Sequence, residues 1–171
     1  MSFDSALAFV LGFEGGYVND PRDYGGATNL GITQRTLDAA RIAHPTWGLP
    51  ASVVSLRRQD AARIYRADYW DAVRGDDLPP GVALLVFDCA VNQGPGRARK
   101  WLQTAVGAVS DGDLGPKTMA AIAEASVCIV IREFGLLRAM GYVTTGQMLV
   151  YGTGWFRRLF GAVVEAVKLR T

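Results

Sequence analysis

The spacing of apolar residues along the chain predicts helices over most of its length. Apolar residues recur at helical intervals between Ala6 and Phe13, so residues 3–13 are expected to form an amphipathic helix that ends at the following Gly-Gly pair. Further helices are expected over residues 34–42, 57–71, 82–92, 96–106, 116–125, 127–141 and 155–169. Residues 82–92 are apolar enough to predict a buried central helix.

Residues 16–33 have a different pattern. They are rich in glycine and turn-forming residues, with short apolar pieces at either end, which predicts a small β-hairpin lobe. Thr33 is placed to cap the helix that follows. The fold class is therefore α+β and mainly α, with one β-lobe near the N-terminus.

The clearest break in the chain is the sequence DDLPPG at residues 76–81. It predicts two parts, residues 1–81 with the β-lobe and the helical residues 82–171, packed together as one compact unit. Pro116 stands where the first turn of the helix expected over residues 116–125 tolerates a proline, because the missing N–H costs nothing there.

Composition narrows the class of protein. Half of the 171 residues are hydrophobic and a fifth are charged, which excludes a disordered chain. A net charge of +2 is too weak to indicate nucleic-acid binding. No run of about 18 apolar residues is present, so we expect no integral membrane segment.

Metal and cofactor chemistry have no support in the sequence. Cys89 and Cys128 stand in apolar runs and are expected to be buried, reduced thiols. The single histidine, His44, precedes Pro45 in an expected surface loop over residues 44–54. No metal-ligand set and no phosphate-binding glycine loop is visible, so we expect no metal and no cofactor. Any hydrolytic chemistry then falls to carboxylates.

The candidate acid is Glu14, which ends the first apolar helix. Burial against apolar neighbours raises the pKa of a carboxyl group, as a general acid near neutral pH requires. A hairpin folding back over this helix end brings Asp23 and Thr28 toward Glu14, and two carboxylates flanking a cleft are typical of glycoside hydrolysis. The alternatives are a surface or capping glutamate and ordinary turn chemistry for the aspartate.

Four strings carry a family resemblance: EGGYVNDPRDYGGATNLGIT at 14–33, YRADYWD at 65–71, FDCAVNQGP at 87–95 and GDLGPKT at 112–118. Together they resemble glycoside hydrolase family 108, the phage-type N-acetylmuramidases, and the last resembles the predicted peptidoglycan-binding region of that family. The resemblance implies a lysozyme-like fold and cleavage of the β-1,4 bond between N-acetylmuramic acid and N-acetylglucosamine.

The resemblance also implies roles for single residues. Glu14 matches the catalytic glutamate of the family, and the order Glu14, Asp23, Thr28 resembles phage lysozymes, in which the Asp and Thr position water. Thr28 stands one residue closer to the aspartate than in that pattern. Asp20 competes with Asp23 as the second carboxylate; we favour Asp23 because its spacing fits.

Substrate contacts are expected from aromatic and amide side chains. Tyr17, Tyr24 and Trp70 are candidates to stack on sugar faces, and Asn29, Asn92 and Gln93 to hydrogen-bond an acetamido group. The alternatives are core aromatics and, for Asn92 and Gln93, an ordinary helix C-cap. Residues 97–101 place three basic residues beside a tryptophan, as either an attractive patch for an anionic wall polymer or a solvated helix face. The terminal helix is either a core helix or a contact for a membrane surface.

These inferences converge on an endolysin-like peptidoglycan hydrolase whose partner is the glycan strand. The alternative from another class is a non-catalytic cell-wall-binding or secretion-assisting protein on the same scaffold, and a further one is a chitinase-like hydrolase. We expect a monomer. The N-terminal residues lack a basic signal-peptide region, so we expect synthesis in the cytoplasm and access to the wall after holin action, lysis or particle-mediated delivery.

Overall fold

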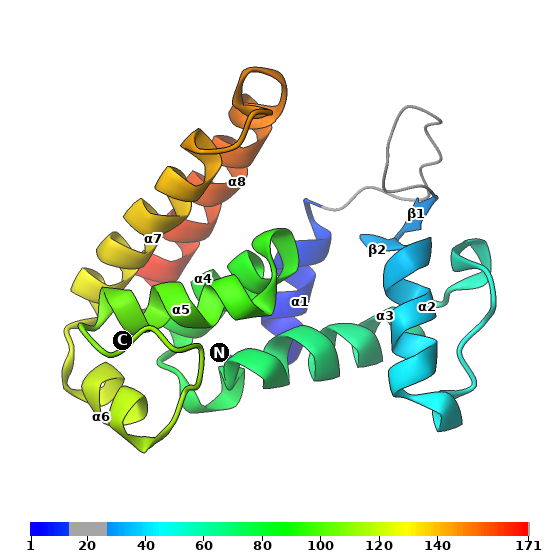
Figure 1. Cartoon of the computed structure of the whole chain (residues 1–171), viewed down its shortest axis with the longest axis horizontal. Helices are drawn as coiled ribbons and strands as arrows, with labels where there is room; N and C mark the ends of the chain where they lie inside the picture. Colours follow the sequence, from blue (N-terminus) through cyan, green and yellow to red (C-terminus); the bar gives the residue numbers. More distant parts are fainter. Residues whose placement is uncertain (14–26, 171) are drawn as a thin grey trace. The chain divides into compact units, whose positions relative to one another are not determined.

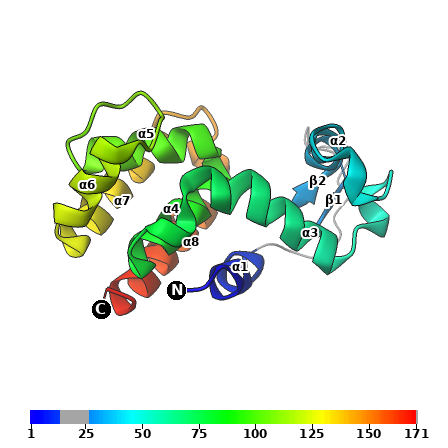
Figure 2. The ribbon, with the colours of Figure 1, turned by 90° about the horizontal axis from the view of Figure 1, so that it is seen from below.

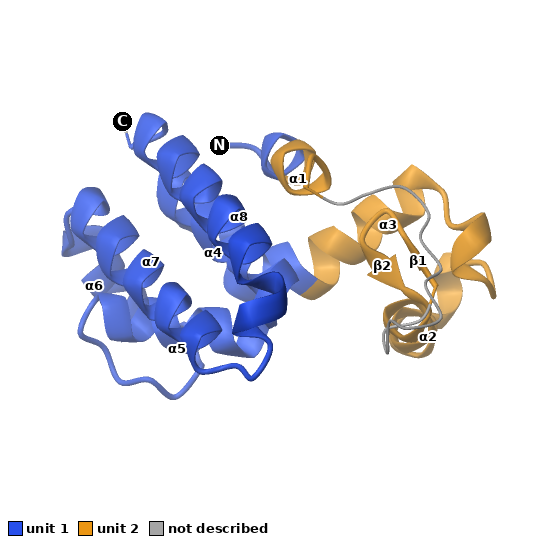
Figure 3. Cartoon of the chain, turned by 90° about the horizontal axis from the view of Figure 1, so that it is seen from above, with its two compact units in different colours: residues 1–6, 69–171 blue, residues 7–68 orange. Residues whose placement is uncertain are grey.

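The computed structural model of the chain describes residues 1–13 and 27–170. It divides into two compact units, one made of residues 1–6 and 69–171 and the other of residues 7–68 (Figure 3). The first helix, α1 (Phe3–Leu11), contributes residues to both units. The expected division at residue 81, into a catalytic and a wall-binding part, concerns function and stays a prediction.

The smaller unit contains the only sheet in the described residues. Strands β1 (Thr28–Asn29) and β2 (Ile32–Thr33) pair antiparallel and form a short hairpin. Helix α2 (Gln34–Ala43) follows directly and lies beside the hairpin (Figure 2). The Thr33 hydroxyl accepts a hydrogen bond from the backbone N–H of Thr36 at 3.1 Å, which confirms the predicted cap. Two 3-10 turns, Pro45–Trp47 and Val53–Ser55, then lead to α3 (Arg58–Ile64).

The hairpin turn carries unusual backbone. Leu30 and Gly31 both have positive φ, 51° and 73°, as a two-residue type I′ turn requires. A leucine rarely adopts this conformation, because its Cβ crowds the backbone. The Leu30 carbonyl accepts a hydrogen bond from the Tyr65 hydroxyl at 3.0 Å, which holds the strained turn in place.

The larger unit is a helical bundle. It comprises α4 (Pro80–Gln93), α5 (Pro95–Ala105), α6 (Pro116–Glu124), α7 (Val127–Val143) and α8 (Met148–Lys168). Helices α7 and α8 run side by side, and α8 also packs against α4 (Figure 1). Three of these helices start with proline in the first turn, as the sequence predicted for Pro116.

Helix α4 is the centre of this unit. Every residue from Gly81 to Ala90 is buried, which confirms the prediction of a central buried helix. Gly81 is required by packing, because an added Cβ would overlap the backbone oxygen of Ala166 in α8. Phe87 packs edge-on against Phe3 and Trp70, with ring centroids 6.0 and 5.3 Å away.

The mainly α class with one small two-stranded sheet is confirmed, and two local expectations are wrong. Helix α8 begins at Met148, seven residues before the expected start at 155, and runs through glycines that lower helix propensity. Contacts one turn apart within the helix support this extension: Gly152 lies close to the Met148 side chain, and the ring centroids of Tyr151 and Trp155 are 5.8 Å apart. Cys128 is exposed, because it lies on the outer side of α7, whereas Cys89 is buried as expected. Both thiols are free.

The expected helix over 57–71 changes its winding part-way. It is α-helical to Ile64 and then becomes a π-helix over Tyr65–Trp70. Such segments are rare and often lie at functional sites.

The terminal helix packs as a core helix. Leu159, Ala162 and Ala166 of α8 are buried, although Phe160 is exposed. Within the described part of the chain, no helix combines the length and apolar character needed to cross a membrane.

Candidate functional site

The catalytic carboxylates predicted from the sequence lie outside the described residues. These carboxylates are Glu14 and Asp23. Three of the expected substrate contacts also lie outside the described residues: Tyr17, Asp20 and Tyr24. Their roles stay predictions. Of the predicted catalytic trio, the structure places Thr28, which is half-buried on β1 and pairs with Thr33.

Asn29, the neighbour of Thr28, anchors the hairpin. Its amide nitrogen donates to the backbone oxygens of Val53 and Leu56, at 3.0 and 3.3 Å. Both hydrogens of this nitrogen are thereby used inside the protein. The expected hydrogen bond between Asn29 and an acetamido group is therefore restricted to the side-chain oxygen, as an acceptor.

Trp70 has no exposed surface, with 0% of its side chain accessible. Its indole nitrogen donates to the Asp76 carboxylate at 3.0 Å, and its ring packs against Phe3 and Phe87. A ring enclosed in this way offers no face to a sugar. Burial therefore supports the core interpretation of Trp70 that the sequence left open.

The His44 side chain is held by contacts with Asp68 and Trp47 and is not a free loop side chain. Its Nε2 lies 3.0 Å from the Asp68 carboxylate, and its ring stacks on Trp47 with centroids 3.7 Å apart. The guanidinium carbon of Arg63 lies 4.5 Å from the centre of the same indole ring. These contacts tie the loop after α2 to α3 and to the π-helix, which gives His44 a structural role.

Asn92 and Gln93 stand in the last turn of α4, half-buried, and both bind residues of α7. The Asn92 Oδ1 accepts from the Tyr142 hydroxyl at 2.8 Å, and the Gln93 Oε1 accepts from the Arg138 Nε at 3.2 Å. The helix is instead capped by Gly94, whose N–H donates to the Ala90 oxygen. The C-cap alternative for these two side chains is thus not what the structure shows.

A buried ion cluster lies behind the two amides. The Asp88 carboxylate lies 2.7 Å from the Arg138 Nη2 and 2.8 Å from the Arg158 Nε. Asp88 and Arg138 are fully buried, and Arg158 nearly so. Burial lowers the pKa of the Arg138 guanidinium, but the Asp88 carboxylate together with smaller contributions from Cys89 and Tyr142 outweighs this effect, so the pKa is raised above the ordinary arginine value. The Arg138 guanidinium therefore stays positively charged inside the protein.

Sequence reasoning missed this cluster, although it held one signal. Asp88 interrupts the apolar run VALLVFDCAV, and a charge inside a buried helix needs a cationic partner. The partners, Arg138 and Arg158, follow 50 and 70 positions later, and local spacing does not identify them. Burial in the same region raises the pKa of the Cys89 thiol to about 12, which makes it unreactive.

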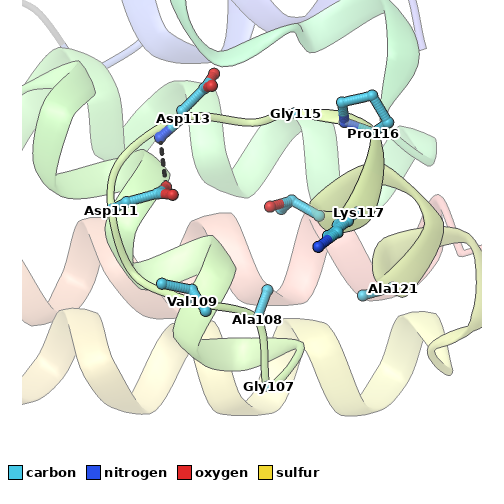
Figure 4. Close-up of a pocket in the computed structure, with 10 residues that line it drawn as sticks. Gly107, Ala108, Val109, Asp111, Asp113, Gly115, Pro116, Lys117 and Ala121 are labelled. Carbon is cyan, nitrogen blue, oxygen red and sulfur yellow. Dashed lines mark hydrogen bonds between the residues drawn. The ribbon is translucent and has the colours of Figure 1, made fainter.

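The GDLGPKT motif forms a closed turn beside a cavity of about 740 Å³ (Figure 4). The Gln103 side chain organises it: its nitrogen donates to the Asp111 carboxylate at 2.7 Å and to the Asp113 carbonyl at 2.8 Å, and its oxygen accepts from the Gly112 N–H. The bond from Gln103 lowers the pKa of the Asp111 carboxyl. The polar groups of the motif thus serve the fold of the loop.

Metal binding gains no support from the placed side chains. Across residues 1–13 and 27–170, no three His, Cys, Asp or Glu side chains gather closely enough to hold an ion.

Comparisons with known proteins agree over most of the chain. Residues 7–94 match the family model described as Glycosyl hydrolase 108. The chain is 38% identical to the protein in the solved structure of Brucella abortus SagA, with a TM-score of 0.88, covering 98% of this chain and 95% of that chain. No curated protein matches the chain.

Proposed function

Because the chain belongs to the glycosyl hydrolase 108 family, we propose that it is an N-acetylmuramidase that cleaves the β-1,4 bond between N-acetylmuramic acid and N-acetylglucosamine in peptidoglycan. The family indicates a glycoside hydrolase of the peptidoglycan-degrading kind, with a glycan as substrate. One observation carries the finer proposal: the family match over residues 7–94 includes the whole segment from Glu14 to Thr33.

In this proposal Glu14 is the general acid. Its protonated carboxyl group donates a proton to the glycosidic oxygen as the bond to the anomeric carbon breaks. Asp23 acts as base or electrostatic partner on the other face of the sugar, and Thr28 helps to position the attacking water. The position of Thr28 supports this role, because the Asn29 anchor and the strand pairing hold β1 in one register.

The test is Glu14→Gln, which removes the acid proton and keeps the shape of the side chain. We expect release of reducing sugar from purified cell walls to fall by about 100-fold or more, since general acid catalysis contributes about 10²–10⁴-fold. Glu124→Gln, the same change on the exposed end of α6, is the matched control and should leave the rate unchanged. Near wild-type lysis by the Glu14 variant would refute the assignment.

Two further assays separate the proposal from its rivals. A muramidase leaves N-acetylmuramic acid at the new reducing end of peptidoglycan fragments and acts poorly on chitin, which lacks the lactyl group. Equal digestion of the two polymers would favour a chitinase-like enzyme. Binding to walls without loss of turbidity would favour a non-catalytic wall-binding protein.

A further inference from the structure

A small polar cavity lies where the end of α4, the start of α5 and the turn between α7 and α8 meet, all within the larger unit. Its volume is about 320 Å³, enough for a single sugar ring or a short peptide segment. We name it the amide pocket. The described residues that line it are Asn92, Gln93, Arg97, Tyr142, Thr145, Gln147 and Trp155.

The buried arginine behind the pocket fixes the direction of the hydrogen bonds around it. A guanidinium only donates, so the contacts from the Arg138 Nε, both 3.2 Å, make acceptors of the Gln93 side-chain oxygen and the Tyr142 hydroxyl oxygen. The tyrosine hydrogen then goes to the Asn92 oxygen at 2.8 Å. The carbonyl ends of both amides are thereby turned toward the protein interior.

The NH₂ ends of the same amides are left for the cavity that they line. Neither the Asn92 Nδ2 nor the Gln93 Nε2 has a hydrogen-bond acceptor among the described residues. Arg97, exposed on the first turn of α5, adds a guanidinium to the lining. The pocket therefore presents amide and guanidinium donors. The amides are oriented by hydrogen bonds that begin at Arg138, whose guanidinium can only donate.

Among the described residues that line the pocket, the charged one is a cation, Arg97, and none is acidic. A site with amide and guanidinium donors selects an oxyanion, and the planar guanidinium of Arg97 suits the two oxygens of a carboxylate. Trp155 supplies an apolar wall for the chemical group to which this carboxylate is attached.

We propose that the amide pocket binds a carboxylate of the peptide stem of peptidoglycan. The assignment of the carboxylate to peptidoglycan rests on the proposed function; the anion selectivity rests on the pocket alone. The pocket would hold a stem peptide while the enzyme acts on the glycan. The protein would then prefer glycan strands that carry stem peptides as substrates.

The test measures the binding of a synthetic stem tetrapeptide to the full-length protein by isothermal titration calorimetry. We expect the peptide with free carboxylates to bind at least about tenfold more tightly than the same peptide with its carboxylates amidated, the range of one charge-assisted contact. Equal affinity for the two peptides, or binding of neither, would overturn the proposal. Inorganic phosphate is the third ligand, and phosphate binding as tight as the peptide would assign the site to a phosphate-bearing polymer instead.

Two variants locate the binding. Arg97→Gln should weaken the affinity for the peptide by about tenfold or more. Lys100→Gln is the control and should leave the affinity unchanged, because it removes the same charge from an exposed residue of α5 outside the pocket. Gln93→Glu keeps the acceptor that Arg138 needs but replaces the outward donor with oxygen, and should abolish binding without loss of fold. Equal effects of the Arg97 and Lys100 changes would reduce the interaction to general charge attraction and refute the site.

The Glu14→Gln variant separates this proposal from the proposed function. It should lose wall hydrolysis and still bind the stem peptide with unchanged affinity. If hydrolysis survives in that variant, the catalytic assignment fails while the pocket stands. If the variant loses hydrolysis but neither the wild-type protein nor the variant binds the peptide, the pocket proposal fails and the catalytic assignment stands.

Discussion

Replacing Asp88 with asparagine tests how much the fold depends on its buried charges. The change removes the carboxylate that Arg138 and Arg158 share, and it leaves the fully buried Arg138 guanidinium without that counter-charge in the core of the larger unit. Breaking a buried pair in this way costs about 3–5 kcal/mol, because the remaining charge is desolvated without a partner. For a chain of this size each kcal/mol lowers the melting temperature by about 2–4 °C, so we expect a fall of roughly 6–20 °C.

The matched control is Asp77→Asn. The Arg74–Asp77 pair has the same 2.8 Å separation as the Arg158–Asp88 pair, but about half of each of its side chains is exposed to solvent. An exposed pair contributes about 0–1 kcal/mol, so this change should move the melting curve by only a few degrees. The measurement is thermal and urea unfolding followed by circular dichroism. Equal destabilisation by the two changes would show that burial does not set the value of the Asp88 cluster.

A double variant sharpens the argument. Removing one cation together with the carboxylate, in Asp88→Asn with Arg138→Met, leaves a single buried guanidinium. The loss in unfolding free energy should then be smaller than the sum of the two single losses by at least about 1 kcal/mol, as expected for groups in one network. Strict additivity would mean that the two side chains do not interact in the folded protein.

Three further predictions concern single positions. Ellman's reagent at pH 8 should modify one thiol in the native protein, the exposed Cys128, and two after denaturation, because Cys89 is buried and its pKa is raised to about 12; rapid modification of both native thiols would contradict this. Leu30→Asn should raise the unfolding free energy by about 0.5–1 kcal/mol, because asparagine tolerates the positive φ of the hairpin turn, and a lower urea midpoint would count against the turn assignment. The lowered pKa of Asp111 means that its bond with Gln103 stabilises the loop above the ordinary carboxyl range and loses that effect as the pH falls through the lowered pKa; an Asp111 titration by NMR that moves up in Gln103→Leu would confirm the cause.

Local signals predicted much of the fold. The Thr33 cap, the prolines at helix starts and the apolar run of α4 each act within a few residues, so the sequence displays them directly. The mainly α, lysozyme-like fold followed from them and from the family resemblance. The roles of Glu14 and Asp23 rest on that resemblance and on spacing, and the Glu14→Gln assay tests the first of them.

Long-range contacts explain what the sequence did not give. The enclosure of Trp70 depends on Phe3 and Phe87, which flank it from distant parts of the chain. The partners of Asp88 stand on two later helices, and the orientation of the Gln93 amide depends on one of them. Periodicity reports which side of a helix is buried, but it carries no information on which residue from another helix meets that side.

The larger unit is discontinuous in sequence, since it holds residues 1–6 as well as everything after residue 68. During synthesis on the ribosome, Phe3 emerges early but its ring partner Phe87 follows much later. At about 5–20 residues per second the interval is roughly 4–17 s, far longer than helices and hairpins need to form. The Phe3 ring therefore stays without this partner while the intervening unit, residues 7–68, has time to fold first.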